Sequence, residues 1–135
     1  MSTNIYIIIA TILWGVGAIF TKVGANNLHP LMLALVAELF YIIFVPLGIW
    51  FTKTPIQMNT TGFIFGFISA ACVGAGSLAY YFALQKGAAG TIAAATSVYP
   101  VLTLIISVAI LNEEISLRKI IGCLLAIISV IIISK

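Results

Sequence analysis

Long apolar stretches alternate with short polar turns along the whole chain. Each stretch holds about 20 residues, the number that a helix needs to cross a hydrocarbon core roughly 30 Å thick. The turns are rich in Gly, Asn, Pro and charged residues, which are typical of the ends of helices. We therefore expect five transmembrane helices. They cover residues 5–23, 30–51, 61–84, 89–111 and 116–134.

The residues at the ends of these stretches support helices. Pro30 stands at the first position of the second stretch, where its missing N–H costs nothing. Ser116 is a suitable N-cap for the last stretch. The runs are too long for strands, and open sheet edges in lipid would leave backbone groups unpaired. The first stretch lacks a basic leader and exceeds a signal-peptide core in length, so we interpret it as an uncleaved span.

Composition agrees with an all-α membrane protein. Hydrophobic residues make up 63% of the 135 residues and charged residues 7%, and the mean hydropathy is +1.27. Soluble domains carry about 25% charged residues, so a soluble enzyme, a disordered protein and a disulfide scaffold are excluded. No linker divides the chain, and we expect one domain over 1–135. The net charge of +3 comes from basic residues that stand singly, which argues against a nucleic-acid partner.

The basic residues in the loops do not favour either orientation in the membrane. With five spans, the side of the N-terminus holds Lys53, Arg118 and Lys119, and the opposite side holds Lys22, Lys86 and Lys135. Orientation normally follows the side richer in Lys and Arg. The count is equal, so the sequence leaves the absolute orientation open.

Residues for catalysis or metal binding are not arranged in any familiar pattern. The single histidine, His29, lies in a turn without a nucleophile and acid beside it, and the chain has no Asp. The two cysteines lie apart in apolar runs. Glu113 and Glu114 are best interpreted as solvated charges that end a helix. We therefore expect no enzyme activity, no metal and no cofactor.

Glu38 is the outstanding polar residue within a span. It lies eight residues after Pro30, so about 12 Å into the helix at 1.5 Å per residue. A carboxylate near mid-membrane is costly unless paired, hydrated or protonated, and is a functional hypothesis by default. We predict that it faces the bundle interior with Ala34 and Tyr41, as a substrate-binding or proton-coupling residue. The alternative is a structural Glu that reaches Lys22.

Pro100 predicts a break in the fourth span. It cannot donate to the carbonyl of Thr96, so the helix should kink near mid-membrane. Thr96, Thr103 and Ser107 share one helical face with Pro100, and Tyr99 adjoins it. Broken helices with polar groups at mid-membrane form substrate sites in secondary transporters. Alternatively, the proline only bends the helix for packing while the hydroxyls bond their own backbone.

Trp14 and the small residues are less specific. Trp14 lies about ten residues into the first span, away from the interface where Trp usually anchors. It is therefore either a cavity aromatic or a packing residue. The spacing of Gly122 and Ala126 in the fifth span favours close helix packing and says little about substrate.

Several segments together resemble the EamA-type domain of the drug/metabolite transporter superfamily. The similarity is strongest at the Tyr-Pro of the fourth span and the Asn-Glu pair after it. The segments are 12–15, 27–31, 78–84, 96–101 and 111–116. The resemblance implies a multi-pass carrier of small metabolites or drugs in a bacterial or archaeal plasma membrane, often an exporter. Many family members carry an Arg near Glu38, so the resemblance does not assign Glu38 a role.

The resemblance also implies an assembly. Most EamA-type carriers hold two inverted five-helix repeats, and this sequence shows one, which corresponds to half of a ten-helix transporter. We therefore expect a second copy, as an antiparallel homodimer, or a homologous half. The alternative function is a non-transporting membrane scaffold or a regulatory subunit of another membrane protein. Substrate, direction of transport and coupling ion are left open by the sequence.

Overall fold

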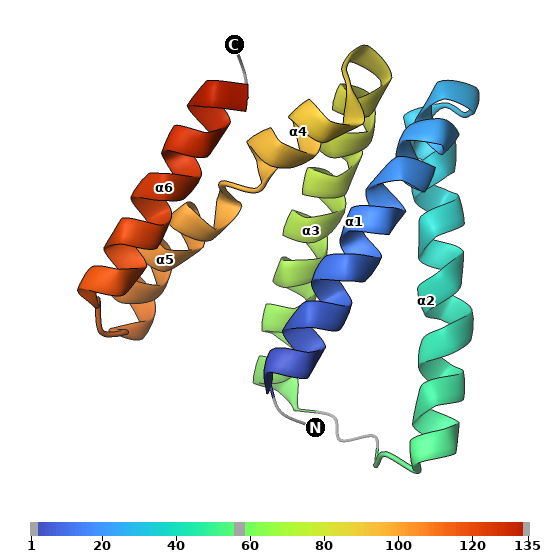
Figure 1. Ribbon diagram of the computed structural model, residues 1–135. Helices are drawn as coiled ribbons and strands as arrows, with labels where there is room; N and C mark the ends of the chain where they lie inside the picture. Colours follow the sequence, from blue (N-terminus) through green and yellow to red (C-terminus); the bar gives the residue numbers. More distant parts are fainter. Residues whose placement is uncertain (1–2, 56–58, 134–135) are drawn as a thin grey trace. The chain divides into compact units, whose positions relative to one another are not determined.

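The computed structural model describes residues 3–55 and 59–133, and these form α-helices joined by short turns (Figure 1). No strand occurs in this described part. The helices are α1 (Thr3–Asn27), α2 (Pro30–Thr52), α3 (Thr60–Lys86), α4 (Ala89–Thr96), α5 (Tyr99–Leu111) and α6 (Leu117–Ile133).

The predicted spans are confirmed for the first four stretches. α1, α2, α3 and the segment Ala89–Leu111 are each long and apolar enough to cross a bilayer. The fifth stretch forms α6, whose 17 described residues extend about 25 Å at 1.5 Å per residue. The described part of α6 is therefore somewhat shorter than a full crossing, and the five-helix bundle is confirmed only approximately. The end of the fifth predicted span, residue 134, lies outside the described residues.

The helix ends follow the local sequence. Pro30 occupies the first turn of α2, and the Nδ1 of His29 accepts a hydrogen bond from the Leu31 N–H at 3.3 Å. Ser116 caps α6 as predicted, because its Oγ accepts from the Lys119 N–H at 3.3 Å. α2 continues through an internal proline, Pro46.

Two helices end in left-handed residues. Lys53 after α2 and Asn112 after α5 have φ of 51° and 52°. Their N–H groups bond carbonyls of the preceding turn, so each residue closes the C-terminus of its helix. Lys53 and Asn112 directly follow apolar stretches of the sequence, which agrees with turns at the membrane surface.

The chain divides into two compact units, residues 1–86 and 87–135. In the first unit α3 packs against both α1 and α2. α1 and α3 run in the same direction and α2 runs against them (Figure 1). Its fully buried residues are Ala25, Pro30 and Leu84, which lie where α1 and α3 end and α2 begins. We call this region the packed end.

Hydrogen bonds from polar side chains join the helices at the packed end. The ammonium of Lys22 donates to the backbone carbonyl of Leu84. The Nε2 of Gln85 donates to the carbonyls of Ala25, at 3.0 Å, and of Leu28, at 3.3 Å. These carbonyls lie at or just beyond the last turns of α1 and α3, where the helix itself offers no donor. The three bonds therefore join the C-terminal ends of α1 and α3.

Close packing supports the same end. A Cβ added at Gly24 would lie 2.8 Å from the Cδ1 of Leu33, so α1 and α2 approach closely there. The imidazole of His29 meets the ring of Phe82 edge-to-face, with centroids 5.8 Å apart. A small residue on α1 and an aromatic contact to α3 thus hold the start of α2 in place.

In the second unit, α6 packs against α4 and α5. The predicted kink is confirmed as a full break, because α4 ends at Thr96 and α5 begins at Tyr99. Ser97 and Val98 between them keep right-handed backbone angles. The N–H groups of Ser97 and Val101 bond carbonyls three residues earlier, at 3.1 and 2.9 Å, so the break is a tightened turn.

Most large apolar side chains are exposed on the surface of the described chain. Trp50, Phe51, Ile110 and Leu117 are each more than 70% exposed, and many others exceed half. In water so much apolar surface would drive association. Lipid covers such surface in a membrane, where the helices satisfy their own backbone hydrogen bonds.

Candidate functional site

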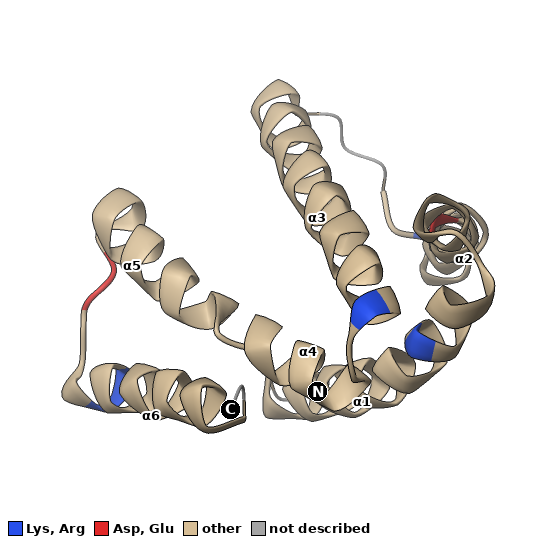
Figure 2. Cartoon of the chain, turned by 90° about the horizontal axis from the view of Figure 1, so that it is seen from above, with Lys and Arg blue, Asp and Glu red and all other residues tan. Residues whose placement is uncertain are grey.

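A cavity of about 380 Å³ lies between α2 and α3 and contains Glu38. We call it the Glu38 cavity. From α2 come Ala37, Glu38 and Tyr41. α3 contributes the rest of the wall, which consists of Ala70, Val73, Gly74, Ser77 and Tyr81. α2 contains one acidic residue, Glu38, and no basic one, and Figure 2 shows how sparse charged residues are along the helices.

Glu38 has no protein partner for its charge. It makes neither a hydrogen bond nor an ion pair with any residue that the structure describes. The alternative partner considered from the sequence, Lys22, instead bonds the carbonyl of Leu84. Tyr41 lies in the cavity with Glu38 as expected, whereas Ala37 and not Ala34 lines it. Glu38 is exposed in the isolated chain and is one of the residues that line this cavity.

A second cavity, of about 310 Å³, lies between α1 and α3 and contains Trp14. We call it the Trp14 cavity. Its wall consists of Leu13, Trp14, Gly17, Ala18, Thr21, Ser77, Tyr80 and Tyr81. Ser77 and Tyr81 line both cavities, so the two spaces adjoin along one edge of α3. Trp14 lines this cavity and is 70% exposed, and its role as a cavity aromatic stays a prediction.

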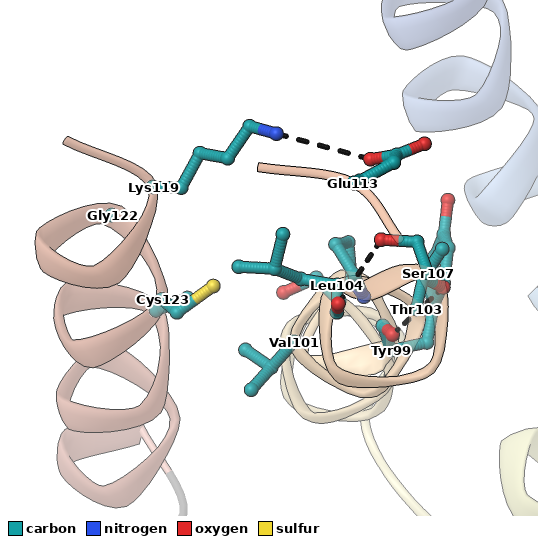
Figure 3. Close-up of a pocket in the computed structure, with 12 residues that line it drawn as sticks. Tyr99, Val101, Thr103, Leu104, Ser107, Glu113, Lys119, Gly122 and Cys123 are labelled. Atoms are coloured by element: carbon teal, nitrogen blue, oxygen red, sulfur yellow. Dashed lines mark hydrogen bonds and ion pairs between the residues drawn. The ribbon is translucent and has the colours of Figure 1, made fainter. Parts of the chain in front are cut away.

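A third cavity, of about 510 Å³, lies within the second unit between α5 and α6. Of the residues predicted from the sequence, Tyr99, Pro100 and Thr103 line it, and Thr96 does not. Ser107 also lines it and is 8% exposed. Figure 3 shows Val101 and Leu104 on the side of α5 that is turned toward Cys123 of α6, with Thr103 and Ser107 on the side away from it.

Three hydroxyl side chains of the fourth span, which we call the hydroxyl stripe (Thr96, Thr103 and Ser107), donate hydrogen bonds to carbonyls of their own helices. Thr96 Oγ1 donates to the carbonyls of Ile92 and Ala93 at 2.9 and 3.0 Å. Thr103 Oγ1 donates to the Tyr99 carbonyl at 3.2 Å, and Ser107 Oγ to the Leu104 carbonyl at 3.0 Å. Each hydroxyl has used its proton and retains lone pairs. The stripe can accept hydrogen bonds from a ligand but has no free O–H to donate.

Two opposite charges lie at the rim of the third cavity. The Nζ of Lys119 lies 3.8 Å from Glu113 Oε2 (Figure 3) and donates to the Glu114 carbonyl at 2.9 Å. Both charged side chains are nearly half exposed. An exposed pair of this length contributes little to stability, in keeping with solvated charges where α5 ends.

Sequence reasoning missed Ser77, Tyr80 and Tyr81 as candidate site residues. Ser77 and Tyr81 are four residues apart, so they share one face of α3. The same spacing rule that identified Thr96, Pro100 and Thr103 would have identified them. In the described part of the chain, no group of three or more His, Cys, Asp or Glu residues lies close enough to hold a metal ion.

Comparisons with known proteins fit this arrangement. No solved structure is significantly similar to the chain. An uncharacterized protein of Methanocaldococcus jannaschii is 31% identical over 127 residues, which cover 94% of this chain and 92% of that protein. The model of the EamA-like transporter family matches residues 1–135. Together with the apolar helices, the match makes this a multi-pass membrane protein. The chain therefore belongs to the EamA-like transporter family of the drug/metabolite transporter superfamily.

Proposed function

We propose that the chain is a secondary transporter that exports small metabolites or drugs across the plasma membrane of a prokaryote, with Glu38 as its coupling residue. One observation carries the proposal: a membrane carboxylate that no described protein group neutralises lies in a cavity large enough for a small molecule. Such residues mark ion and substrate pathways in membrane proteins. Membership in a transporter family agrees with this role.

The cavities favour transport over a scaffold role. A scaffold needs apolar surface and close helix contacts, and these explain the packed end and the exposed apolar side chains. They do not explain why Glu38, Tyr41 and Tyr81 line one space within the membrane. A carboxylate there disfavours simple packing, because it must find a proton, water or a cation. Binding and release of such a partner is the elementary step of a coupled carrier.

We further propose that two copies act together in opposite orientations. The cavities are open at the surface of a single chain, so a second chain would enclose them. The equal number of basic residues on the two sides permits both orientations. The archaeal relative is matched over 92% of its length, so it too is about the size of one repeat. A heterodimer with an oppositely oriented homologue is the alternative assembly.

Transport can be tested without knowing the substrate. The purified full chain is reconstituted into proteoliposomes that enclose the pH dye pyranine, and a panel of amino acids, amines and nucleosides is added outside. Wild type should move protons when its substrate is added, and Glu38→Gln should remove the signal. The matched control, Glu114→Gln, changes a carboxylate that lines none of the three cavities and should retain the signal. An equal response of Glu38→Gln and wild type would remove Glu38 from coupling.

Assembly is tested by topology. Reporters fused to the C-terminus, one active in the cytoplasm and one active outside, should both give signal if the chain inserts both ways. Adding one Lys next to Met1 should shift the population to a single orientation, since small charge differences decide a balanced topology. Signal from one reporter alone would exclude the antiparallel homodimer and leave the heterodimer.

A further inference from the structure

We infer that the adjoining Glu38 and Trp14 cavities form one binding site for an organic cation that carries an aromatic or otherwise apolar body. This inference rests on the proposed transport function and narrows its substrate class. It is drawn from the charge, the aromatic side chains and the size of the two cavities, all of which lie within residues 1–86.

The charge of the lining residues favours a cationic ligand. Glu38 is the one acidic side chain among the residues that line either cavity, and none of these lining residues is Lys, Arg or His. The nearest basic residue in α1 by position, Lys22, is already bonded to the carbonyl of Leu84 at the packed end. A ligand anion would therefore meet an uncompensated carboxylate in a medium of low dielectric, where like charges repel strongly. A ligand cation would supply the missing partner.

Aromatic side chains from three helices line the two adjoining cavities. Tyr41 comes from α2, Trp14 from α1, and Tyr80 and Tyr81 from α3. Aromatic faces attract cations through their ring quadrupole, and Trp is the most effective of the three aromatic residues. The combination of a carboxylate with several aromatic rings recognises ammonium groups whose substituents are apolar. A small inorganic cation would instead require several oxygen ligands in a fixed geometry.

Size and position admit a molecule with one aromatic ring. The cavities measure about 380 and 310 Å³, within the range of small-molecule sites. Ser77 and Tyr81 border both, so a ligand can place its charge beside Glu38 and its body against Trp14. Ser77 lies nine residues before the end of α3, about 14 Å from the packed end by helical rise. Its depth matches that of Glu38, so both halves of the site lie at one level of the membrane.

The cavity of the second unit provides a contrast within the same chain. It contains Lys119 as well as Glu113, and those charges pair with each other at 3.8 Å. A ligand cation would gain little there, because the carboxylate already has a partner and is exposed to water. The cation site is therefore assigned to α1, α2 and α3.

The test measures binding by the full chain in lipid nanodiscs, with empty nanodiscs as the blank. Three ligands share a benzyl or phenyl group: benzyltrimethylammonium is a cation, N-benzylacetamide is neutral and benzenesulfonate is an anion. Calorimetry should detect binding of the cation. The affinity for the neutral compound should be lower by about tenfold or more, because that compound lacks the charge interaction with Glu38. The anion should not bind.

Matched variants locate the site. Glu38→Gln should weaken cation binding by about tenfold or more, and Glu38→Asp, which retains the charge, should bind within several-fold of wild type. Tyr81→Leu should weaken binding several-fold, whereas Tyr6→Leu should not, because Tyr6 lines neither cavity. Glu114→Gln serves as the carboxylate control. Size-exclusion profiles and helical circular dichroism that match wild type confirm that each variant is folded.

Two results would overturn the inference. One is equal affinity of folded Glu38→Gln and wild type for benzyltrimethylammonium, and the other is binding of N-benzylacetamide as tight as that of the cation. The transport assay separates this failure from failure of the proposed function. Suppose that a neutral or anionic compound drives Glu38-dependent proton movement and the cation does not bind. The proposed transport function would then stand, and the cation site would be rejected.

Discussion

Gln85 offers a direct test of how the first unit is held together. Its side-chain amide donates to the carbonyls of Ala25 and Leu28, 60 and 57 residues earlier in the chain. Gln85→Leu removes both hydrogen bonds and retains a side chain of similar size. The two carbonyls lie at the end of α1, where no backbone N–H of the helix can replace the lost donor. We therefore expect the packed end to loosen.

The magnitude follows from the number of bonds. Interhelical hydrogen bonds in membrane proteins average about 0.6 kcal/mol and reach about 1.7 kcal/mol. Two such bonds, at 3.0 and 3.3 Å, should together contribute about 1–2 kcal/mol to the free energy of unfolding. That corresponds to roughly a tenfold change in the equilibrium between folded and unfolded chains. Gln85→Glu should be more disruptive, since its carboxylate would face two carbonyl oxygens.

The assay is reversible unfolding of the full chain in mixed micelles of increasing SDS content, followed by circular dichroism. Thr11→Val is the control, because Thr11 donates within α1 to the Ile7 carbonyl at 2.8 Å and joins no two helices. The control should unfold close to wild type. If Gln85→Leu and Thr11→Val unfold within about 0.3 kcal/mol of each other, the hydrogen bonds of the packed end do not stabilise the unit as reasoned.

Three further variants test other elements. Pro100→Ala supplies an N–H for the carbonyl of Thr96, so the break should straighten. Transport per molecule should then fall several-fold while the abundance of the protein stays normal. Unchanged transport would assign the break to packing alone. Ser116→Ala removes the N-cap of α6 and should lower the free energy of unfolding by about 1 kcal/mol, whereas no change would show that the cap is dispensable. Gly24→Val should lower the free energy of unfolding by about 1–3 kcal/mol, because its Cβ would lie 2.8 Å from Leu33. Gly24→Ala should lower it less, since the end of that leucine side chain can rotate. Equal stability of the two variants would contradict the close approach of α1 and α2.

Local chemistry predicted most of the secondary structure. Apolar runs of about 20 residues identify helices in lipid without reference to the rest of the chain, and Pro30 and Ser116 mark helix starts through their own backbone and side-chain properties. Pro100 predicted the break because a missing N–H acts on the adjacent turn.

The arrangement of side chains was less predictable, because it depends on how the helices face one another. Glu38 and Tyr41 were identified by depth and helical spacing, yet nothing in the sequence pairs them with Tyr81 of α3. The partner of Lys22 is a backbone carbonyl, which has no signature in a sequence. Thr96 shares its helical face with Thr103, but the break after Thr96 separates it from the cavity that Thr103 lines.

The hydrogen bonds that join α1 and α3 at the packed end have a consequence for biosynthesis. Lys22 and Gln85 join segments 62 and 57–60 residues apart, so these bonds cannot form until α3 has left the ribosome. At about 5–20 residues per second, the Lys22 ammonium waits roughly 3–12 s for its partner, because the Leu84 carbonyl lies 62 residues later in the chain. Once α2 has been made, α1 and α2 are joined by their turn and by the close approach of Gly24 and Leu33, without the hydrogen bonds to α3. The arrival of α3 supplies the acceptor for Lys22 and the amide that bonds α1, so the first unit becomes fully joined only when its third helix is complete.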